Sequence, residues 1–330
     1  MIRVTASAPG KLVLCGEYAV LDGAPAIGMA IDRRARASLQ PNDAEYHTVT
    51  APGFSTACGK FRCAGGDFEW LEAGDEFALV EHVWMAANAE PPESLALSLD
   101  TRAFADAASG RKIGIGSSAA LAVALTGALH EVAGKAADIA AVATAAHRKL
   151  QGGAGSGIDV CCSHRGGVIE FIMRKDSCMP MGWPEDLAYA VLWSGVPAST
   201  DAKLAQFRAR SPRPSRAALV TAAERVARTW AAGSAVAILD EMRAYTEALR
   251  SFSSDHDMGI FDAGHAELVD AATGDAVYKP CGAGGGDVGI VLARSEDAIA
   301  SFIAAAPIAN FVQLDISIDV RGLHSVRDEH

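Results

Sequence analysis

The chain has 330 residues, of which 50% are hydrophobic and 21% are charged, so it can bury a sizeable core in one large or two medium domains. Its net charge of −11 argues against nonspecific binding to nucleic acid or to an anionic membrane. Residues 1–8 lack the pattern of a signal peptide, and the most apolar stretch, Ala119–Leu129, is far shorter than the ~20 residues of a membrane span. We therefore expect a cytoplasmic protein that binds neither nucleic acid nor a membrane.

The seven cysteines are odd in number, scattered, and without a CxxC pair. This pattern predicts neither a zinc ribbon nor a disulfide framework, and favours reduced thiols. The nine histidines show no HExxH or other metal-binding spacing.

The first forty residues predict short strands broken by the turn formers Pro9-Gly10 and Asp22-Gly23. These strands are Ile2–Ala8, Lys11–Leu14 and Ala26–Leu39. The residues that follow predict three helices and one further strand. The helices are Phe77–Asn88, Ser118–Val132 and Ile139–Leu150, and the strand is Leu95–Leu99.

A change of composition follows the predicted strand Gly167–Met173. The segment Lys175–Asp186 has little periodicity and contains three turn-forming residues, so we expect a boundary there, between domains 1–178 and 179–330. The second half predicts the strand Leu187–Trp193, helices between Ser215 and Phe252, the strands Ala276–Lys279 and Val288–Leu292, and the helix Glu296–Ala305. Mixed strands with grouped helices indicate α+β layers rather than a regular βαβ repeat.

Three glycine-rich segments stand out. They are Ala8–Val20 (APGKLVLCGEYAV), Lys112–Ala120 (KIGIGSSAA) and Lys279–Gly289 (KPCGAGGGDVG). In the second, two glycines allow a tight turn and two serines open a long helix, whose N-terminal N–H groups and dipole form an anion site. A simple helix cap by Ser117 or Ser118 explains the same residues. The glycine run of the third indicates either close backbone approach to a ligand or a flexible hairpin loop.

Two common nucleotide-binding classes are excluded by context. Gly114–Ala119 and Gly284–Gly289 match the spacing of a dinucleotide fingerprint, but neither lies between a strand and a helix. Neither is followed ~20 residues later by an acidic residue that closes a second strand. The sequence has no GxxxxGK[ST], which excludes a P-loop NTPase.

In order and spacing, the three segments resemble the three motifs of the GHMP kinases (galactokinase, homoserine kinase, mevalonate kinase and phosphomevalonate kinase), over nearly the whole chain. The resemblance implies an α+β, two-domain GHMP kinase fold with the active site between the domains, and ATP and Mg²⁺ as cofactors. The second motif would surround the ATP phosphates with Lys112, Gly114, Gly116, Ser117, Ser118 and Ala119. The hydroxyls of Ser117 and Ser118 would hold Mg²⁺.

The resemblance also implies the catalytic residues Lys11, Asp159 and Ser117. Lys11 would meet the transferring phosphoryl group, and Asp159 would pair with Lys11 or act as a general base. A surface lysine and a helix-capping aspartate are the structural alternatives. Glu17 either holds a helix terminus or a metal-linked water, or makes a structural hydrogen bond.

Within the family, Ala146–Val160 (AHRKLQGGAGSGIDV) and Trp193–Thr200 resemble the phosphomevalonate kinase subgroup. The implied acceptor is the small molecule phosphomevalonate, bound by a monomer or homodimer. The implied substrate-binding residues are Lys11, Ser156, Gly157, Asp159, Ser199, Gly282, Ala283 and Gly284. Departures from the pattern are His147, where a metal-binding acid stands in related kinases, and Cys161-Cys162 in place of small residues.

Several alternatives stay open. Arg148, Arg165 and Lys203 are either ligands of the acceptor phosphate or solvated helix-face cations. Trp193 is interpreted as a core residue, and residues 72–85 are expected to contribute to the adenine pocket. Mevalonate is the first alternative acceptor. A silent GHMP-fold binding protein is the non-enzyme alternative, disfavoured because the implied catalytic residues are all present.

Overall fold

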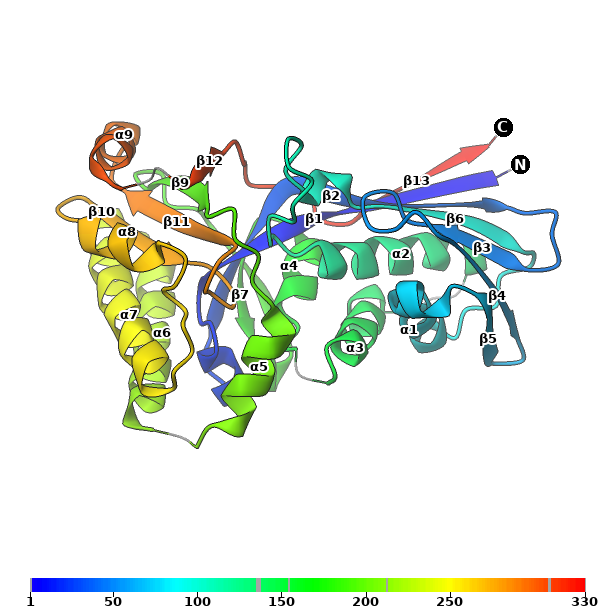
Figure 1. The fold of residues 1–330 in the computed structure, drawn as a ribbon, viewed down its shortest axis with the longest axis horizontal. Helices are drawn as coiled ribbons and strands as arrows, with labels where there is room; N and C mark the ends of the chain where they lie inside the picture. The colour runs from blue at the N-terminus through cyan, green and yellow to red at the C-terminus, as the bar shows by residue number, and fades with distance from the viewer. Residues whose placement is uncertain (1, 135–137, 154, 212, 308–309, 330) are drawn as a thin grey trace.

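The computed structural model describes residues 2–134, 138–153, 155–211, 213–307 and 310–329. Its strands form two sheets, which lie toward opposite ends of an elongated molecule (Figure 1). The large, nine-stranded sheet has the order β13-β1-β2-β6-β3-β4-β5, with β7 and β8 attached beside β2. The small, four-stranded sheet has the order β10-β11-β9-β12. This mixed α+β architecture confirms the predicted fold class.

The strands of the large sheet are β1 (Ile2–Cys15), β2 (Ala26–Pro41), β3 (His47–Thr50), β4 (Cys58–Ala64), β5 (Asp67–Glu72), β6 (Leu95–Asp100), β7 (Val168–Ile172), β8 (Ser177–Met181) and β13 (His324–Glu329). Those of the small sheet are β9 (Ala188–Trp193), β10 (Ala276–Pro280), β11 (Val288–Ala293) and β12 (Val312–Leu314).

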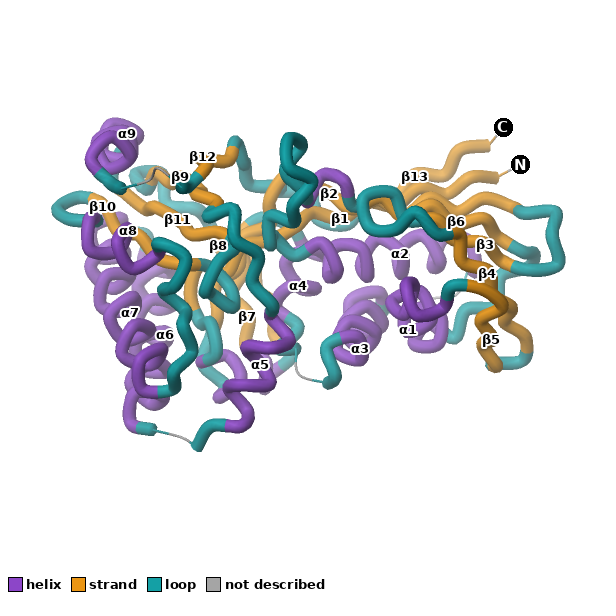
Figure 2. Tube along the Cα trace, viewed as in Figure 1, coloured by secondary structure: helices purple, strands orange, loops and turns teal. Residues whose placement is uncertain are grey.

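The helices lie mainly on one side of the sheets (Figure 2). Those near the large sheet are α1 (Ala78–Ala87), α2 (Ser117–Ala133), α3 (Ile139–Leu150) and α4 (Ile158–Arg165). Those near the small sheet are α5 (Thr200–Ala209), α6 (Pro214–Ala232), α7 (Ala235–Asp255), α8 (His265–Ala271) and α9 (Glu296–Ala305). Short 3₁₀ turns are η1 (Ala19–Asp22), η2 (Gly74–Phe77), η3 (Arg102–Phe104) and η4 (Met173–Lys175). Among the described residues, no helix has the length and apolarity needed to cross a membrane.

The first strand differs from the prediction at Pro9-Gly10. The turn formers do not break β1, because the pairing of β1 with β2 shifts register between these two residues and then continues. Such a bulge absorbs the irregularity and redirects the residues that follow it. Gly10 is required there, since an added Cβ would lie 2.6 Å from the Ile115 carbonyl oxygen.

The helix α2 accounts for the apolar stretch of the sequence. Residues 119–120 and 122–129 are all buried in the helix, which packs against β1 and β2. It ends at Gly134, whose left-handed conformation (φ 62°) stops the helix. The α3 and α9 helices have the predicted bounds.

The region around the predicted domain boundary contains structure that composition did not indicate. The strand β8 runs across residue 178 and pairs with β7, and α5 follows β9. The last strand, β13, returns to the large sheet and pairs with β1. The division into domains 1–178 and 179–330 stays a proposal.

One cysteine prediction is wrong. The structure pairs Cys161 of α4 with Cys178 of β8 as a disulfide, with their Cα atoms 6.4 Å apart. The seventeen-residue separation matches no sequence motif, and the two sulfurs meet only because β8 folds back along β7 beside α4.

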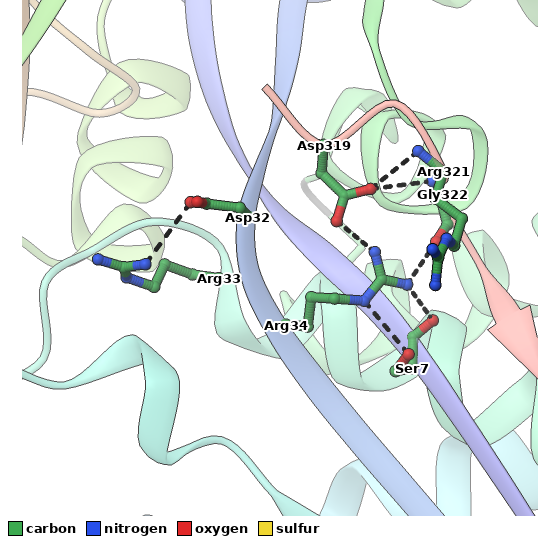
Figure 3. A network of polar contacts seen from close by, with 7 residues as sticks. All are labelled: Ser7, Asp32, Arg33, Arg34, Asp319, Arg321 and Gly322. Carbon is green, nitrogen blue, oxygen red and sulfur yellow. Dashed lines mark hydrogen bonds and ion pairs between the residues drawn. The ribbon is translucent and has the colours of Figure 1, made fainter. Parts of the chain in front are cut away.

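A polar network attaches the C-terminal segment to the large sheet (Figure 3). The Arg34 guanidinium contacts the Asp319 carboxylate and donates to the carbonyl oxygens of Ser7 (2.7 Å) and Gly322 (2.6 Å). The Leu323 amide donates to the His164 carbonyl at the end of α4 (3.0 Å). The C-terminal segment therefore contacts the helix that carries Asp159.

Candidate active site

A cavity opens where segments of both halves of the chain meet. Its lining comes from the first motif, from the end of α3 and start of α4, from α5 and from the third motif. The lining residues used below are Lys11, Glu17, Tyr18, His147, Gln151, Ser156, Gly157, Asp159, Gly282 and Ala283. Lys11 reaches the cavity from β1, just after the Pro9-Gly10 bulge, and its amide donates to the Ile115 carbonyl (2.9 Å).

Lys11 and Asp159 form an ion pair in this cavity. The Lys11 Nζ lies 3.2 Å from an Asp159 carboxylate oxygen, and the two side chains are 11% and 23% exposed. Burial opposes the charge on Lys11, but attraction to Asp159 outweighs it and raises the pKa of the ammonium. Asp159 lies in the first turn of α4, after Gly157 in a left-handed conformation (φ 100°). The lysine is therefore held protonated at the cavity wall.

The start of α2 is open to an anion. The N-cap is Gly116 (φ 85°) and no side chain caps the helix, so the interpretation of Ser117 or Ser118 as N-cap is wrong. The first backbone N–H groups of a helix have no partner within it and carry its positive dipole end. The Ser118 hydroxyl shares a hydrogen bond of 3.0 Å with Nε2 of His147, from α3. The second motif thus presents N–H groups and hydroxyls.

The three glycine-rich motifs are in contact with one another. A Cβ added to Gly116 would lie 3.0 Å from Cε of Lys11, and one added to Gly114 would collide with the Asp287 carboxylate. A Cβ on Gly282 would lie 3.9 Å from Nζ of Lys11. The Asp287 carboxyl group at this contact is largely buried, and burial raises its pKa. Glycine is needed at Gly114 and Gly116 because side chains of the third and first motifs approach their backbone closely, and all three positions have a positive φ.

The third motif is fastened to the first. The Tyr18 hydroxyl donates to the Ala283 carbonyl (2.7 Å). The Lys279 ammonium, which is fully buried, donates to a Glu17 carboxylate oxygen (2.5 Å). Of the two interpretations of Glu17, the structure shows a buried structural contact.

Six of the predicted substrate-binding residues line the cavity: Lys11, Ser156, Gly157, Asp159, Gly282 and Ala283. The other two are engaged elsewhere. The Ser199 hydroxyl caps α5 by accepting from the Ala202 amide (3.3 Å), and Gly284 (φ 70°) packs against Ile260.

The cations proposed for the acceptor phosphate are not in the cavity lining of the described residues. Arg148 donates to the carbonyl oxygens of Gly155 (3.1 Å) and Ser156 (2.7 Å), so it shapes the loop before α4. Lys203 donates to the Met258 carbonyl, and Arg165 is exposed at the end of α4.

The structure also locates two residues that the sequence singled out, Trp193 and Lys112, and two cavity residues that it did not assign. Trp193 is buried in the core, as interpreted. Lys112 lies 5.4 Å from the ring centre of the exposed Phe54, and its role in ATP binding stays a prediction. His147 and Gln151 line the cavity, although neither was assigned a substrate contact. Their spacing of four residues on a helix is a signal that could have grouped them.

Residues 97–167 match the family model described as the GHMP kinases N terminal domain. This segment is therefore similar to the N-terminal domain of the GHMP kinases. The phosphomevalonate kinase of Streptomyces sp. (strain CL190) is 29% identical to this chain over 348 residues, covering 88% of this chain and 89% of that protein. The mevalonate kinase of Pyrococcus horikoshii is 29% identical over 214 residues, covering 63% and 62%.

The fold is that of the GHMP kinases along its length. The structure of Streptococcus pneumoniae phosphomevalonate kinase in complex with phosphomevalonate and AMPPNP aligns with a TM-score of 0.75 at 18% identity. The alignment covers 95% of this chain and 99% of that one. Family and fold together support a phosphotransferase that acts on a small molecule.

Proposed function

We propose that this GHMP kinase is a cytoplasmic, Mg²⁺-dependent phosphomevalonate kinase. It transfers the γ-phosphoryl group of ATP to (R)-5-phosphomevalonate and forms 5-diphosphomevalonate. The observation that carries the proposal is that residues of the first and third motifs line one cavity with the Lys11–Asp159 pair, while Gly116 of the second motif lies against the Lys11 side chain. The choice of acceptor is supported by the phosphomevalonate kinase relative, whose match extends over most of both chains.

The chain provides a fitting site for the phosphates of ATP. The uncapped N-terminus of α2 offers N–H groups, and its left-handed glycines let a phosphate approach the backbone. We assign this contact to Lys112, Gly114, Gly116, Ser117, Ser118 and Ala119. Among the described residues, no group of three or more acidic, histidine or cysteine side chains could hold a metal ion. A Mg²⁺ ion would therefore rest on the Ser117 and Ser118 hydroxyls and on phosphate oxygens, where it would neutralise phosphate charge.

The acceptor decides what Lys11 and Asp159 must do. A phosphate monoester has a second pKa of about 6, so at neutral pH it is mostly dianionic and needs no base to become a nucleophile. The difficulty is to bring two anions together, which requires a cation between them. Lys11 supplies that cation, and Asp159, 3.2 Å away, keeps it protonated and oriented.

Mevalonate is the second candidate acceptor. Mevalonate kinases align with 63% of this chain, and a hydroxyl acceptor would use Asp159 as a general base. No arginine lies in the cavity lining of the described residues, so no guanidinium there is available to bind the phosphate of phosphomevalonate with two hydrogen bonds. The experiment that decides is an acceptor panel.

Purified protein with saturating Mg·ATP is assayed for ADP release with mevalonate, phosphomevalonate, homoserine and galactose. We expect kcat/KM for phosphomevalonate to exceed that for mevalonate by at least about tenfold, equivalent to ~1.4 kcal/mol in transition-state binding. Equal or faster turnover of mevalonate would reject the proposed acceptor. No turnover of any acceptor would favour the silent binding protein.

A further inference from the structure

A buried ion pair forms part of the cavity wall. Glu17 and Lys279 are 262 residues apart in sequence, and their side chains are 2% and 1% exposed. The Lys279 ammonium donates to one Glu17 oxygen (2.5 Å) and to the Val13 carbonyl (3.3 Å). The other Glu17 oxygen accepts from the Tyr245 hydroxyl (2.6 Å), and Glu17 also lines the cavity. Lys279 thus lies behind the cavity wall and contacts two residues that line it, Glu17 and Val13.

The other titratable groups around this pair are neutral at neutral pH. They are Cys15, Tyr18, Tyr245 and Cys281, and burial raises the pKa of each of them. Burial disfavours the charge of Lys279 as well, but the attraction and the hydrogen bond of the Glu17 carboxylate oppose this effect, and the pKa of the ammonium is raised. Among the described residues of this network, the two charged groups are therefore Glu17 and Lys279.

These two charges complete the charge balance of the cavity. Lys11 is paired with Asp159 and Glu17 with Lys279, so the four groups sum to zero. If Lys279 lost its charge, the wall would carry an unpaired carboxylate facing the same space as the substrate. A like charge in a region of low dielectric is strongly unfavourable for an anion.

We propose that Lys279 is a positioning residue for an anionic acceptor: it neutralises and fixes the Glu17 carboxylate, and so lets a highly charged substrate enter the cavity. The proposal rests on the proposed function only in requiring an anionic acceptor. It predicts that two substitutions change the acceptor KM in opposite directions. Lys279→Met leaves a negative charge at the wall and raises the acceptor KM, whereas Glu17→Gln leaves a positive charge and lowers it. Structural damage alone would raise KM in both variants.

The test measures acceptor KM and kcat from pH 6 to 9 for whichever acceptor of the panel turns over. We expect Lys279→Met to raise KM about tenfold and Glu17→Gln to lower it about threefold, each relative to wild type at the same pH. An unpaired buried carboxylate gains a proton more easily, and an unpaired buried ammonium loses one. The effect of Lys279→Met therefore grows toward high pH, and that of Glu17→Gln toward low pH. The double variant, with neither charge, returns KM to within about threefold of wild type.

Tyr245→Phe is the matched control, because it removes the hydroxyl that donates to the same carboxylate and accepts from the Gly16 amide, but removes no charge. It should lower Tm and leave the acceptor KM near the wild-type value. An increase of KM in both charge variants, or no change in either, overturns the proposal. If Lys279→Met does not fold, Glu17→Gln against Tyr245→Phe decides, and an unchanged or raised KM in Glu17→Gln overturns it.

Failure of this proposal and failure of the proposed function give different results. Mevalonate carries one carboxylate and no phosphate, so it is a less charged acceptor. If mevalonate proves to be the substrate, the proposed acceptor is wrong, but the opposite signs remain with smaller changes in KM. If phosphomevalonate is the substrate and the two variants change the acceptor KM in the same direction, the proposed acceptor is right and the proposed role of Lys279 is wrong.

Discussion

The two glycines that bound α2 give a matched pair of substitutions for testing how Lys11 is placed. Both have left-handed conformations, with φ of 85° at Gly116 and 62° at Gly134. Alanine at either position costs about 1–2 kcal/mol of backbone energy, and we expect both variants to lose similar stability, about 1–4 °C in Tm.

The two positions differ in their surroundings. An alanine Cβ at Gly116 would lie 3.0 Å from Cε and 3.1 Å from Cγ of Lys11, whereas at Gly134 nothing lies within 4 Å. Lys11 must then shift by a few tenths of an ångström or more. It cannot do so freely, because its Nζ is paired with Asp159 at 3.2 Å. A misplacement approaching 1 Å costs about 10²-fold in rate, so we expect kcat/KM of Gly116→Ala to fall by about 10- to 100-fold.

The assay compares thermal unfolding and ADP release for both variants and wild type. Gly134→Ala should keep kcat/KM within about twofold of wild type while losing Tm like Gly116→Ala. If Gly116→Ala is as active as Gly134→Ala at equal loss of stability, Lys11 is either not displaced or not needed for transfer. The contact between the first and second motifs would then have no catalytic role.

Three further results are expected. With phosphomevalonate, Lys11→Met should lower kcat/KM by about 10³-fold and Asp159→Asn by only about tenfold. The wild-type rate should rise with pH through the second pKa of the substrate phosphate, about 6. If rate measurements show the larger loss in Asp159→Asn, Asp159 acts as a general base. Arg34→Met removes the contacts of one partly buried guanidinium, and should cost about 3 kcal/mol in denaturant unfolding and speed hydrogen exchange in β13 first. Burial lowers the pKa of His47 to about 4. The neutral imidazole is favoured in the folded state, so this group should lower stability by about 2–3 kcal/mol as pH drops from 6.5 to 4. His47→Gln should remove this contribution and leave those of the other histidines whose pKa burial lowers, such as His164 and His265.

Local signals in the sequence were sufficient for several elements. The α3 helix could be bounded because Gly152-Gly153 end it, and Asp138, whose side chain accepts from the Ala141 amide (3.1 Å), starts it. The cluster of glycines marked the third motif because left-handed backbone is accessible to few other residues. These features depend on residues within one turn of each other.

Features that depend on tertiary pairing could not be predicted. The segment around Pro180 suggested a domain boundary, but β8 pairs with β7 there, and a proline is tolerated in an edge strand. The pairing of Glu17 with Lys279 gave no signal, because the two residues are 262 positions apart and meet only in the tertiary structure. The spacing of His147 and Gln151 could group these two residues, but it could not show that His147 contacts Ser118 of α2.

The pairing of β13 with β1 has a consequence for synthesis of the chain. Ile2 pairs with Glu329 and Ser7 with His324, so the outer edge of the first strand stays unpaired until almost the whole chain has left the ribosome. Contacts of such long sequence separation form late and slowly, and an exposed strand edge meanwhile can capture another chain. A fragment ending at residue 178 would keep Lys11 and Asp159 yet lack this closing strand. Such a fragment should therefore aggregate, even though it contains most of the residues of the large sheet.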